Sequence, residues 1–480
     1  MTLPFVIALD QGTSSCRAMA VDQEGHIRAQ RSVQFSPVRQ APGLSQYRAE
    51  DLLAAQTSVL NGLLDEIGPQ QVAALAVCSQ RSTVVLWDKN TGKSVAPVLT
   101  WEDGRAQQES NQAPLSQAQV HQVTGLFKTP YFSAPKITWC LKNFPEAAQA
   151  ARANTLCVAP VASYFIWQLT QGSTFAVDPT LAQRTLLWDI QTGDWSETLC
   201  RAFEVPLSSL PSLRASAADY GSYLYKGVSI PIYTCVADQQ AAAFYHGLTS
   251  GKTSVNYGTG AFVLHHTGSQ LIVLPGMLSS VAATTSVEQR AFLLEGPVFA
   301  AGSVFQWLQS QGIYIDPTQV DNLCTKAEHP VSFLPALGGL GAPYWDYNVG
   351  PVPQKVDGAQ TPQDWVAGAL RGIAHLVADI TDYLRVNAQA VTTVEVSGGL
   401  SQSVYLLQCQ ANFLNVSLYR QNQTEATVLG TALLAWQRLI KSPLNWQLAQ
   451  QETVFPNVSA EQSQAERRAW KEFVAKCRGK

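Results

Sequence analysis

The chain of 480 residues is long enough for two or more domains, and 46 % of its residues are hydrophobic while only 14 % are charged. This composition excludes a disordered chain, because disordered segments combine low hydrophobicity with a high charge content. The net charge is −3 and no long run of Lys or Arg occurs, so the chain lacks the basic stripe needed for sequence-independent binding to nucleic acid. We therefore expect no nucleic-acid partner.

The cysteines and the N-terminus indicate a cellular compartment. Nine cysteines occur without a Cys-x-x-Cys pair, and most stand inside apolar runs, as buried free thiols do. Such thiols are typical of a reducing compartment. The N-terminus lacks the pattern of a signal peptide, and no apolar run reaches the roughly 20 residues that span a bilayer. The sequence predicts a cytoplasmic protein with no membrane partner.

The first element in the chain is a pair of strands around a Gly-Thr turn, within residues 5–22. A second pair with the same pattern occupies residues 252–266, about half the chain length further on. Each is an apolar strand, a tight turn and another apolar strand. This spacing indicates that one strand–turn–strand unit has been duplicated, and hence that the chain has two related domains.

Strands and helices alternate along the rest of the chain. The periodicity of apolar residues predicts helices over residues 49–67 and 430–439, a long helix capped at Thr361, a helical C-terminal tail, and strands over residues 72–79, 83–87, 230–237 and 394–396. This alternation favours α/β domains with sheets covered on both faces. We place the boundary near residues 246–252, where glycines interrupt the pattern, and expect domains over residues 1–246 and 247–480.

Two segments partly match the sequence of a nucleotide-binding Walker A loop. Residues 247–253 are one residue short of that motif and precede a strand where the motif needs a helix. Residues 90–94 lack its first glycine, because Trp87 occupies that position. Both are interpreted as ordinary turns.

The two Gly-Thr turns suit phosphate binding. Glycines and small hydroxyl residues present several backbone N–H groups in one direction, which forms a concavity for phosphate oxygens. Asp10 ends the strand before the first turn, where a carboxylate can hold Mg²⁺, and Arg17 supplies a positive charge. A single turn would more readily be a plain β-hairpin, whereas two copies at this spacing favour phosphate binding.

Residues 9–17, Leu-Asp-Gln-Gly-Thr-Ser-Ser-Cys-Arg, resemble the phosphate loop of the FGGY carbohydrate kinases, and within that family the glycerol kinases. The resemblance extends over nearly the whole chain. It continues in family order through residues 80–83, 100–105, 131–139, 237–240, 257–260, 294–296, 302–306, 341–346 and 398–399. It implies two RNase H-like domains of the actin/hexokinase type, with ATP, Mg²⁺ and a small polyol or sugar substrate in a central cleft.

The resemblance also implies roles for individual residues. Asp238 matches the catalytic base. Residues that match contacts to the nucleotide or its phosphates are Thr13, Ser14, Ser15, Arg17, Thr259, Gly302, Gln306, Gly399 and Ser403. Residues that match the substrate pocket are Arg81, Ser82, Trp101, Asp103, Tyr131, Asp238, Gln239 and Phe262.

The residue types fit this chemistry. A carboxylate at the end of a strand, such as Asp238, can take the proton of an attacking hydroxyl, although a helix N-cap is the alternative explanation for it. Arg81 and Gln239 can hold neighbouring hydroxyls, and Trp101 and Phe262 offer apolar faces to C–H groups. Each aromatic residue taken alone would more often be part of a core.

Several positions depart from the glycerol kinase pattern. Ser82 replaces a glutamate that binds a glycerol hydroxyl in that branch, and residues 101–105 look more like those of the pentulose kinases. Ser403 replaces an asparagine. We expect the shorter, neutral Ser82 to weaken glycerol binding and to admit a longer substrate, so that a xylulokinase-like pentulose or tetritol kinase is the alternative.

Two non-catalytic functions compete with the kinase. An actin-like ATP switch would need both phosphate turns but not the set of Arg81, Trp101, Tyr131 and Asp238-Gln239. A degenerate kinase that acts as a regulator would not need to keep Asp10, Thr13, Asp238 and Thr259. The site chemistry thus favours a kinase. The sequence is compatible with a homodimer or a homotetramer and does not distinguish them.

Overall fold

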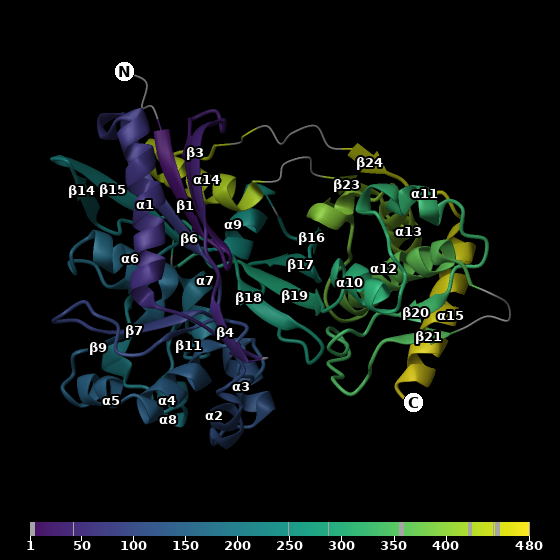
Figure 1. The fold of residues 1–480 in the computed structure, drawn as a ribbon, viewed down its shortest axis with the longest axis horizontal. Coiled ribbons are helices and arrows are strands. Elements are labelled where there is room, and N and C mark those ends of the chain that lie inside the picture. The colour runs from purple at the N-terminus through teal and green to yellow at the C-terminus, as the bar shows by residue number, and fades with distance from the viewer. Residues whose placement is uncertain are drawn as a thin grey trace. The chain divides into compact units, whose positions relative to one another are not determined.

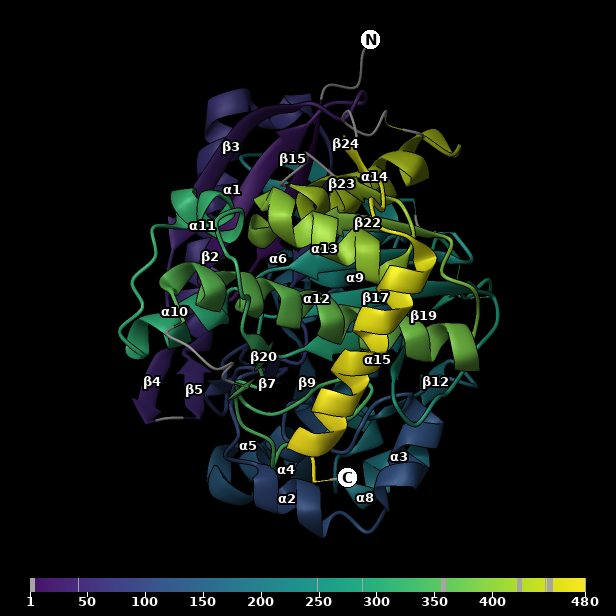
Figure 2. The same cartoon turned by 90° about the vertical axis from the view of Figure 1, so that its right-hand side faces the viewer.

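The structure is a computed structural model that describes residues 5–41, 43–247, 249–286, 288–354, 360–420, 425–444, 446 and 452–479. The chain forms two compact units (Figures 1 and 2). The first unit comprises residues 1–247, 280–291 and 425–447, and the second comprises residues 248–279, 292–424 and 448–480. The sequence predicted a division at residues 246–247. It did not predict that residues 280–291 and 425–447 belong to the first unit.

The sheet of the first unit begins with an antiparallel meander. It has the order β14-β15-β6-β1-β2-β3, in which β1 pairs with β2, and β2 with β3, in antiparallel fashion. The next two strands, β6 and β15, run parallel to β1 and to each other. The strand bounds are β1 (Phe5–Gln11), β2 (Ser15–Val21), β3 (Ile27–Gln34), β6 (Val72–Ser79), β14 (Ser222–Tyr225) and β15 (Val228–Ala237).

The second unit repeats this order. Strands β19, β17 and β16 are antiparallel, and β22 and β23 then follow parallel to β16, with β24 antiparallel at the edge. The bounds are β16 (Lys252–Tyr257), β17 (Ala261–Gly268), β19 (Phe292–Val298), β22 (Thr393–Ser397), β23 (Leu418–Arg420) and β24 (Glu452–Val454). The expected duplication and the α/β fold class are confirmed, because both sheets consist of an antiparallel meander extended by two parallel strands.

Helices from distant parts of the sequence cover the first sheet. Helix α1 (Ala49–Ile67) packs against β2 and β3, while α14 (Ala426–Ile440) packs against β1, β6 and β15. Helix α14 also contacts α9 (Asp238–Tyr245), and Leu434 of α14 lies in one apolar cluster with Cys78, Val236 and Ala241. The buried Trp436 of α14 donates its indole N–H to the carbonyl of Val21 at 3.2 Å. Helix α14 thus completes the core of the first unit.

A five-stranded sheet forms the rest of the first unit. Its order is β4 (Val38–Ala41), β5 (Leu44–Tyr47), β8 (Val98–Leu99), β7 (Val84–Asp88) and β9 (Leu156–Pro160). Around it lie short elements: α2 (Gln107–Gln112), α3 (Gln117–Thr124), α4 (Ser133–Asn143), α5 (Pro145–Arg152), α6 (Val161–Leu169), α7 (Pro179–Ala182), α8 (Glu197–Ala202), β10 (Ala176–Val177), β11 (Trp188–Asp189), β12 (Asp194–Trp195) and β13 (Ser212–Leu213). The buried Trp87 packs against Tyr164, Trp167 and Phe175 and fixes this region.

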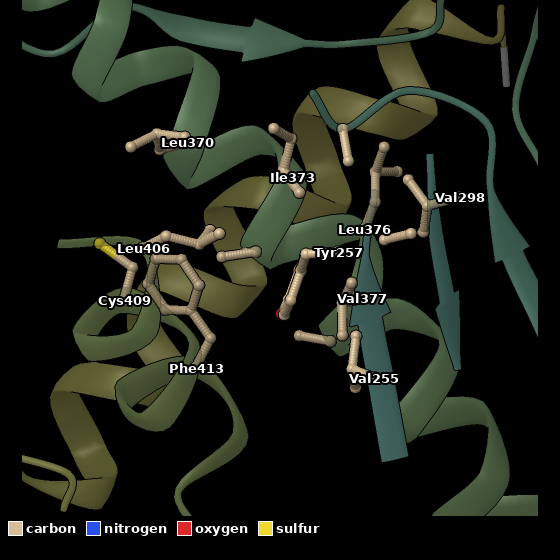
Figure 3. Close-up of a cluster of buried hydrophobic side chains, with 14 of the residues drawn as sticks. Val255, Tyr257, Val298, Leu370, Ile373, Leu376, Val377, Leu406, Cys409 and Phe413 are labelled. Atoms are coloured by element: carbon tan, nitrogen blue, oxygen red, sulfur yellow. The ribbon is translucent and has the colours of Figure 1, made fainter. Parts of the chain in front are cut away.

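The core of the second unit is built on α12 (Pro362–Asn387). Its start carries the expected capping box, in which Thr361 and Asp364 each accept the other's backbone N–H. Figure 3 shows side chains of α12, among them Leu370, Ile373 and Val377, packed with Val255 and Tyr257 of β16 and Phe413 of α13 (Val404–Leu414). The remaining elements are β18 (Leu278–Val281), α10 (Ser303–Ser310), α11 (Val320–Cys324), β20 (Ser332–Leu334), β21 (Val352–Gln354) and α15 (Ala460–Cys477).

Most elements expected from periodicity have nearly the expected bounds. Helix α1 and strand β6 coincide with residues 49–67 and 72–79, and the C-terminal tail forms α15. Strand β16 starts at Lys252, which agrees with the rejection of a Walker A loop there. Among the described residues, no helix combines the length and the apolar character that crossing a bilayer requires.

The contact between α14 and α9 depends on Gly430. A Cβ atom at this position would overlap the carbonyl oxygen of Ala241 and crowd the Cβ of Tyr245. Two helices can approach this closely only where one of them has no side chain, so we expect Gly430→Ala to lower the free energy of unfolding by about 1–3 kcal/mol. Urea denaturation followed by circular dichroism measures the change. Gly350→Ala is the matched control, because nothing lies within 4 Å of its Cβ position, and an equal effect of both substitutions would contradict the close packing of α14.

Candidate active site

In the first unit, the candidate residues gather where three parallel strands end. Gln11 of β1 pairs with Ser79 of β6, and Ser79 pairs with Ala237 of β15, so the three strands finish at the same level. The segments that follow these ends hold the first Gly-Thr turn, Gln80-Arg81-Ser82 and Asp238-Gln239. The carboxyl ends of parallel strands are the usual position of sites in open α/β sheets.

Asp238 is the first residue of α9, and the N-cap is Ala237. Its Oδ1 accepts the N–H of Gln239 at 2.7 Å and lies 4.0 Å from Nε of Arg81. Burial raises the pKa of the Asp238 carboxyl to about 6, the charge of Arg81 opposes this shift, and the charge of Asp10 adds to it. A quarter of the side chain still reaches solvent. Asp238 is therefore a partly accessible carboxylate with a pKa near neutrality, as suits a general base.

Hydrogen bonds to a buried polar group fix the end of β15. The backbone N–H of Ala237 donates to the hydroxyl of Thr180 at 2.9 Å, and that hydroxyl donates in turn to the carboxylate of Asp178. Burial raises the pKa of Asp178 to about 6, while the hydroxyls of Ser216 and Thr180 favour its charged form. This arrangement fixes the backbone from which Asp238 projects.

Asp10 and Arg17 form an ion pair across the first hairpin. Nη2 of Arg17 lies 2.5 Å from Oδ2 of Asp10, and Nη1 lies 2.5 Å from Oε2 of Glu425, the residue just before α14. Cys78 contacts the other oxygen of Asp10 at 3.5 Å. Arg17 keeps 29 % of its side chain exposed, so its guanidinium is shared between two carboxylates and solvent.

The first Gly-Thr turn is joined to the aromatic part of the site through Thr13. The hydroxyl of Thr13 accepts the indole N–H of Trp101 at 3.0 Å and contacts the amide oxygen of Gln80 at 3.4 Å. Gln80 is buried and donates to the carbonyl of Gly12 at 3.1 Å. Ser14 is exposed and Ser15 is half-buried at the start of β2. Hydrogen bonds from Gln80 and Trp101 thus fix the turn, while Ser14 at its tip is exposed.

Trp101 and Tyr131 form the aromatic wall of the site. Their rings lie 5.7 Å apart at 55°, and both residues are half-buried. Lys136 of α4 is fully buried and donates to the carbonyl of Tyr131 at 2.6 Å. Burial lowers the pKa of Lys136 to about 7, and the charge of Asp103 opposes that shift. Lys136 thereby anchors the segment that carries Tyr131.

Ser82 has an unusual environment. Its backbone is in the left-handed region, with φ of 62°, and the residue is only 1 % exposed. Its hydroxyl has no hydrogen-bond partner among the described residues, while its carbonyl accepts from Ser133 at 3.3 Å and from Lys136 at 3.5 Å. A strained residue with an unpaired buried hydroxyl is costly, and such residues cluster at ligand-binding sites.

Asp103 does not fit the expected contact with a substrate. Its side chain is fully buried, and Arg105 binds both of its oxygens through Nε at 2.8 and 3.0 Å. The backbone N–H of Ser45 donates to it at 2.6 Å. These donors occupy both oxygens of the Asp103 carboxylate, so neither oxygen is accessible to a substrate. Instead, the carboxylate fixes the loop that carries Trp101.

In the second unit, the other Gly-Thr turn has its own supporting backbone. The N–H groups of Ala301 and Ser303 donate to the carbonyl of Thr259 at 2.9 and 3.1 Å, and that of Gly302 donates to Gly258 at 2.9 Å. A Cβ at Gly398 would overlap the backbone of Tyr257, just before this turn. Gly302 and Gly398-Gly399 therefore lie beside the turn of residues 258–260, with Gly399 exposed.

The other expected residues of the second unit differ in accessibility. Gln306 is exposed on α10, and Phe262 is 38 % exposed on β17. Ser403 is buried, and its hydroxyl caps α13 and donates to Asp321 at 2.5 Å. The side chain of Ser403 is thus engaged within the protein, which leaves the backbone of Gly399 as the open part of this segment.

Sequence reasoning missed Gln80, Glu425 and Lys136 as members of the site. Gln80 and Lys136 stand inside the motifs that were recognised, but their role is to support other residues. Glu425 could not be found, because its position beside Arg17 depends on the return of α14 to the first unit. Among the described residues, no group of three or more His, Cys, Asp or Glu side chains could hold a metal ion by itself.

The solved structures most similar in fold include a glycerol kinase from Plasmodium falciparum with ADP, with a TM-score of 0.92, 24 % identity and coverage of 99 % of this chain and 98 % of that one. A xylulose kinase from Lactobacillus acidophilus has a TM-score of 0.87 with 20 % identity, over 99 % of this chain and 98 % of that one. These likenesses establish the actin/hexokinase-like ATPase fold.

Among sequence relatives, a glycerol kinase from Koribacter versatilis is 34 % identical over all of this chain and 99 % of its own, and one from Shewanella halifaxensis is 32 % identical over all of both chains. The models of the N-terminal and C-terminal domains of the FGGY family match residues 5–245 and 253–437. The chain therefore belongs to the FGGY family of carbohydrate kinases.

Proposed function

We propose that this chain transfers the terminal phosphoryl group of ATP to a hydroxyl of a small polyol or sugar, with Asp238 as the base. One observation carries the proposal: a carboxylate with a pKa of about 6 lies 4.0 Å from Arg81, at the strand ends that also hold a Gly-Thr turn. An ATP switch without a substrate would need neither this carboxylate nor the aromatic wall of Trp101 and Tyr131.

The nucleotide would lie between backbone N–H groups. Thr13, Ser14 and Ser15 of the first turn and Thr259 of the second would bind phosphate oxygens, and Gly302, Gln306 and Gly399 would contact the rest of the nucleotide. Open turns of this type suit phosphate. Because 29 % of the Arg17 side chain is exposed, its guanidinium would exchange a carboxylate partner for a phosphate oxygen when ATP binds.

Asp10 fits a role in holding Mg²⁺. Mg²⁺ in kinases is bound by one or two carboxylates together with phosphates and water, so it does not need a cluster of three acidic residues. Asp10 and Asp238 are close enough for the charge of Asp10 to raise the pKa of Asp238. When bound, Mg²⁺ would neutralise charge on the phosphates, and Asp10 would be its main protein ligand.

The protein's own residues then perform the transfer. Arg81 and Gln239 orient the substrate hydroxyls, and Trp101 and Tyr131 cover its C–H groups. Asp238 accepts the proton of the attacking hydroxyl as the new O–P bond forms and the bond from the terminal phosphorus to the bridging oxygen of the departing ADP breaks. This requires the ionised form of Asp238. Positioning and charge neutralisation supply most of the rate in phosphoryl transfer.

Ser82 bears on the choice of substrate. The glycerol kinase relatives suggest glycerol as the substrate. However, the buried hydroxyl of Ser82 has no hydrogen-bond partner among the described residues, so it is available to a substrate hydroxyl. A substrate with a fourth or fifth carbon could place a hydroxyl there. A pentulose or tetritol kinase is therefore the second candidate. We also infer a cytoplasmic location from nine free cysteines.

The role of Asp238 is tested by Asp238→Asn. The amide cannot accept a proton, so we expect kcat to fall by roughly 10²–10⁴-fold, the usual contribution of a positioned base. Steady-state kinetics with a polyol panel measure the loss, and calorimetry with ADP checks that nucleotide binding persists. Near-normal turnover in this variant would exclude Asp238 as the base.

The raised pKa of Asp238 predicts a pH dependence. Its ionised form is the active one, so kcat/KM should be constant above the pKa of about 6 and should fall about tenfold per pH unit below it. Arg81→Gln removes a charge that lowers this pKa, so the inflection should move to higher pH in addition to any loss of binding. A pH profile measured in both proteins tests this, and an unchanged inflection would mean that another group titrates.

The substrate prediction concerns Ser82→Glu. Restoring a carboxylate should shift the ratio of kcat/KM values toward glycerol, relative to four- and five-carbon polyols and ketoses, by about tenfold if one charged hydrogen bond decides the choice. Ser82→Gln is the control, since the glutamine side chain has the length of glutamate without its negative charge. If the unmodified enzyme already prefers glycerol to every longer substrate, this interpretation of Ser82 is wrong.

A further inference from the structure

The second unit contains a pocket that the kinase reaction does not use. It has a volume of about 500 Å³ and lies among the C-terminal ends of α12 and α13 and residues 460–471 of α15, the helix drawn in yellow in Figure 2. It shares no residue with the second Gly-Thr turn, Gly302 or Gly398-Gly399. Its size lies in the range of small-molecule sites, which is roughly 300–1,000 Å³.

The lining of the pocket is rich in positive charge. Four cationic side chains, Arg385, Arg467, Arg468 and Lys471, line it together with a single carboxylate, Asp382. That carboxylate is shared, since Nζ of Lys471 lies 2.8 Å from it, Arg467 lies at 3.1 Å and Arg385 at 3.7 Å. Arg467 also pairs with Asp379 beneath the lining, so two acids face four cations and the pocket keeps an excess of positive charge.

The floor of the pocket is fixed by buried contacts. Arg467 is 6 % exposed and also pairs with Asp379, which accepts the indole N–H of Trp470 and the hydroxyl of Tyr344, both at 2.9 Å. Next to Arg467, the ring of His375 is stacked between Phe413 and Trp470. This part of the pocket is therefore preorganised, whereas Arg468 and Lys471 are exposed at its edge.

Helix capping explains only part of this charge. Arg385 donates to the carbonyl of Leu414 at 2.7 Å, and a cation at a helix C-terminus is stabilised by the helix dipole. Burial lowers the pKa of Arg385, the charge of Asp382 opposes this shift, and the charge of Arg467 adds to it. Capping also gives no reason for Arg468 and Lys471 to line the same pocket.

We infer that this pocket binds a small phosphate monoester, such as a phosphorylated polyol. Guanidinium groups match the geometry of phosphate, and charge-assisted hydrogen bonds to it are among the strongest in proteins. Phe413, Leu414 and Val386 give the pocket an apolar side for a short carbon chain. The site is separate from the catalytic residues, and it does not depend on the kinase proposal.

Calorimetric titration of the full chain with glycerol 3-phosphate tests the inference. A non-hydrolysable ATP analogue and glycerol are kept in excess so that the catalytic residues do not contribute. We expect binding of one ligand, and a loss of affinity of about tenfold or more in Arg468→Gln/Lys471→Gln, which removes two charge-assisted contacts from the edge of the pocket. A parallel titration with inorganic phosphate shows whether the phosphate group alone suffices.

The matched control is Lys326→Gln/Lys476→Gln, which removes the same charge from exposed positions outside the pocket. It should bind glycerol 3-phosphate as the unmodified protein does. Thermal unfolding of each variant checks that the fold is intact. Absence of binding to the unmodified protein, or equal losses in the two double variants, would overturn the inference.

Discussion

The candidate site depends on the register of three strands. Because β1, β6 and β15 run parallel and end at one level, residues far apart in sequence, Asp10, Arg81 and Asp238, come to the same edge of the sheet. A shift of one residue in this pairing would turn the side chains to the opposite face and place the carboxylates in the core. Strands β1 and β6 are buried at every residue except Phe5 and Ala73, which leaves little freedom for such a shift.

The same edge concentrates charge that the fold must compensate. Asp10 is paired with Arg17, Asp103 with Arg105, and the buried Lys136 relies on backbone carbonyls. The ion pair of Asp238 is longer, with 4.0 Å between its Oδ1 and Nε of Arg81. Separating a buried charge from its partner is strongly destabilising, so the buried Asp103–Arg105 pair is structural, whereas the more exposed Arg17 and Asp238 are less tightly bound to their partners.

The sequence predicted the regular elements well, because apolar periodicity and capping residues are local signals. Helix α1 and the capping box at Thr361 show this. It also predicted the two strand–turn–strand units, which the structure has in β1–β2 and β16–β17. It did not predict that α14 completes the first unit, that Asp103 is covered by Arg105, or that Ser403 caps α13. These are outcomes of tertiary packing, and a motif match does not distinguish a side chain that meets a ligand from one that supports its neighbour.

The return of α14 has a consequence for the chemistry. Glu425, just before this helix, shares Arg17 with Asp10, and Gly430 lets the helix contact α9, which begins at Asp238. A segment that follows most of the second unit in sequence therefore contacts both carboxylate-bearing strand ends of the first. Any strain that displaces residues 425–440 would act on the Asp10–Arg17 pair and on the position of α9 together. In this fold the strand ends that hold the candidate site of the first unit therefore depend on a segment that follows most of the second unit in sequence. The local sequence of those strand ends does not indicate this dependence.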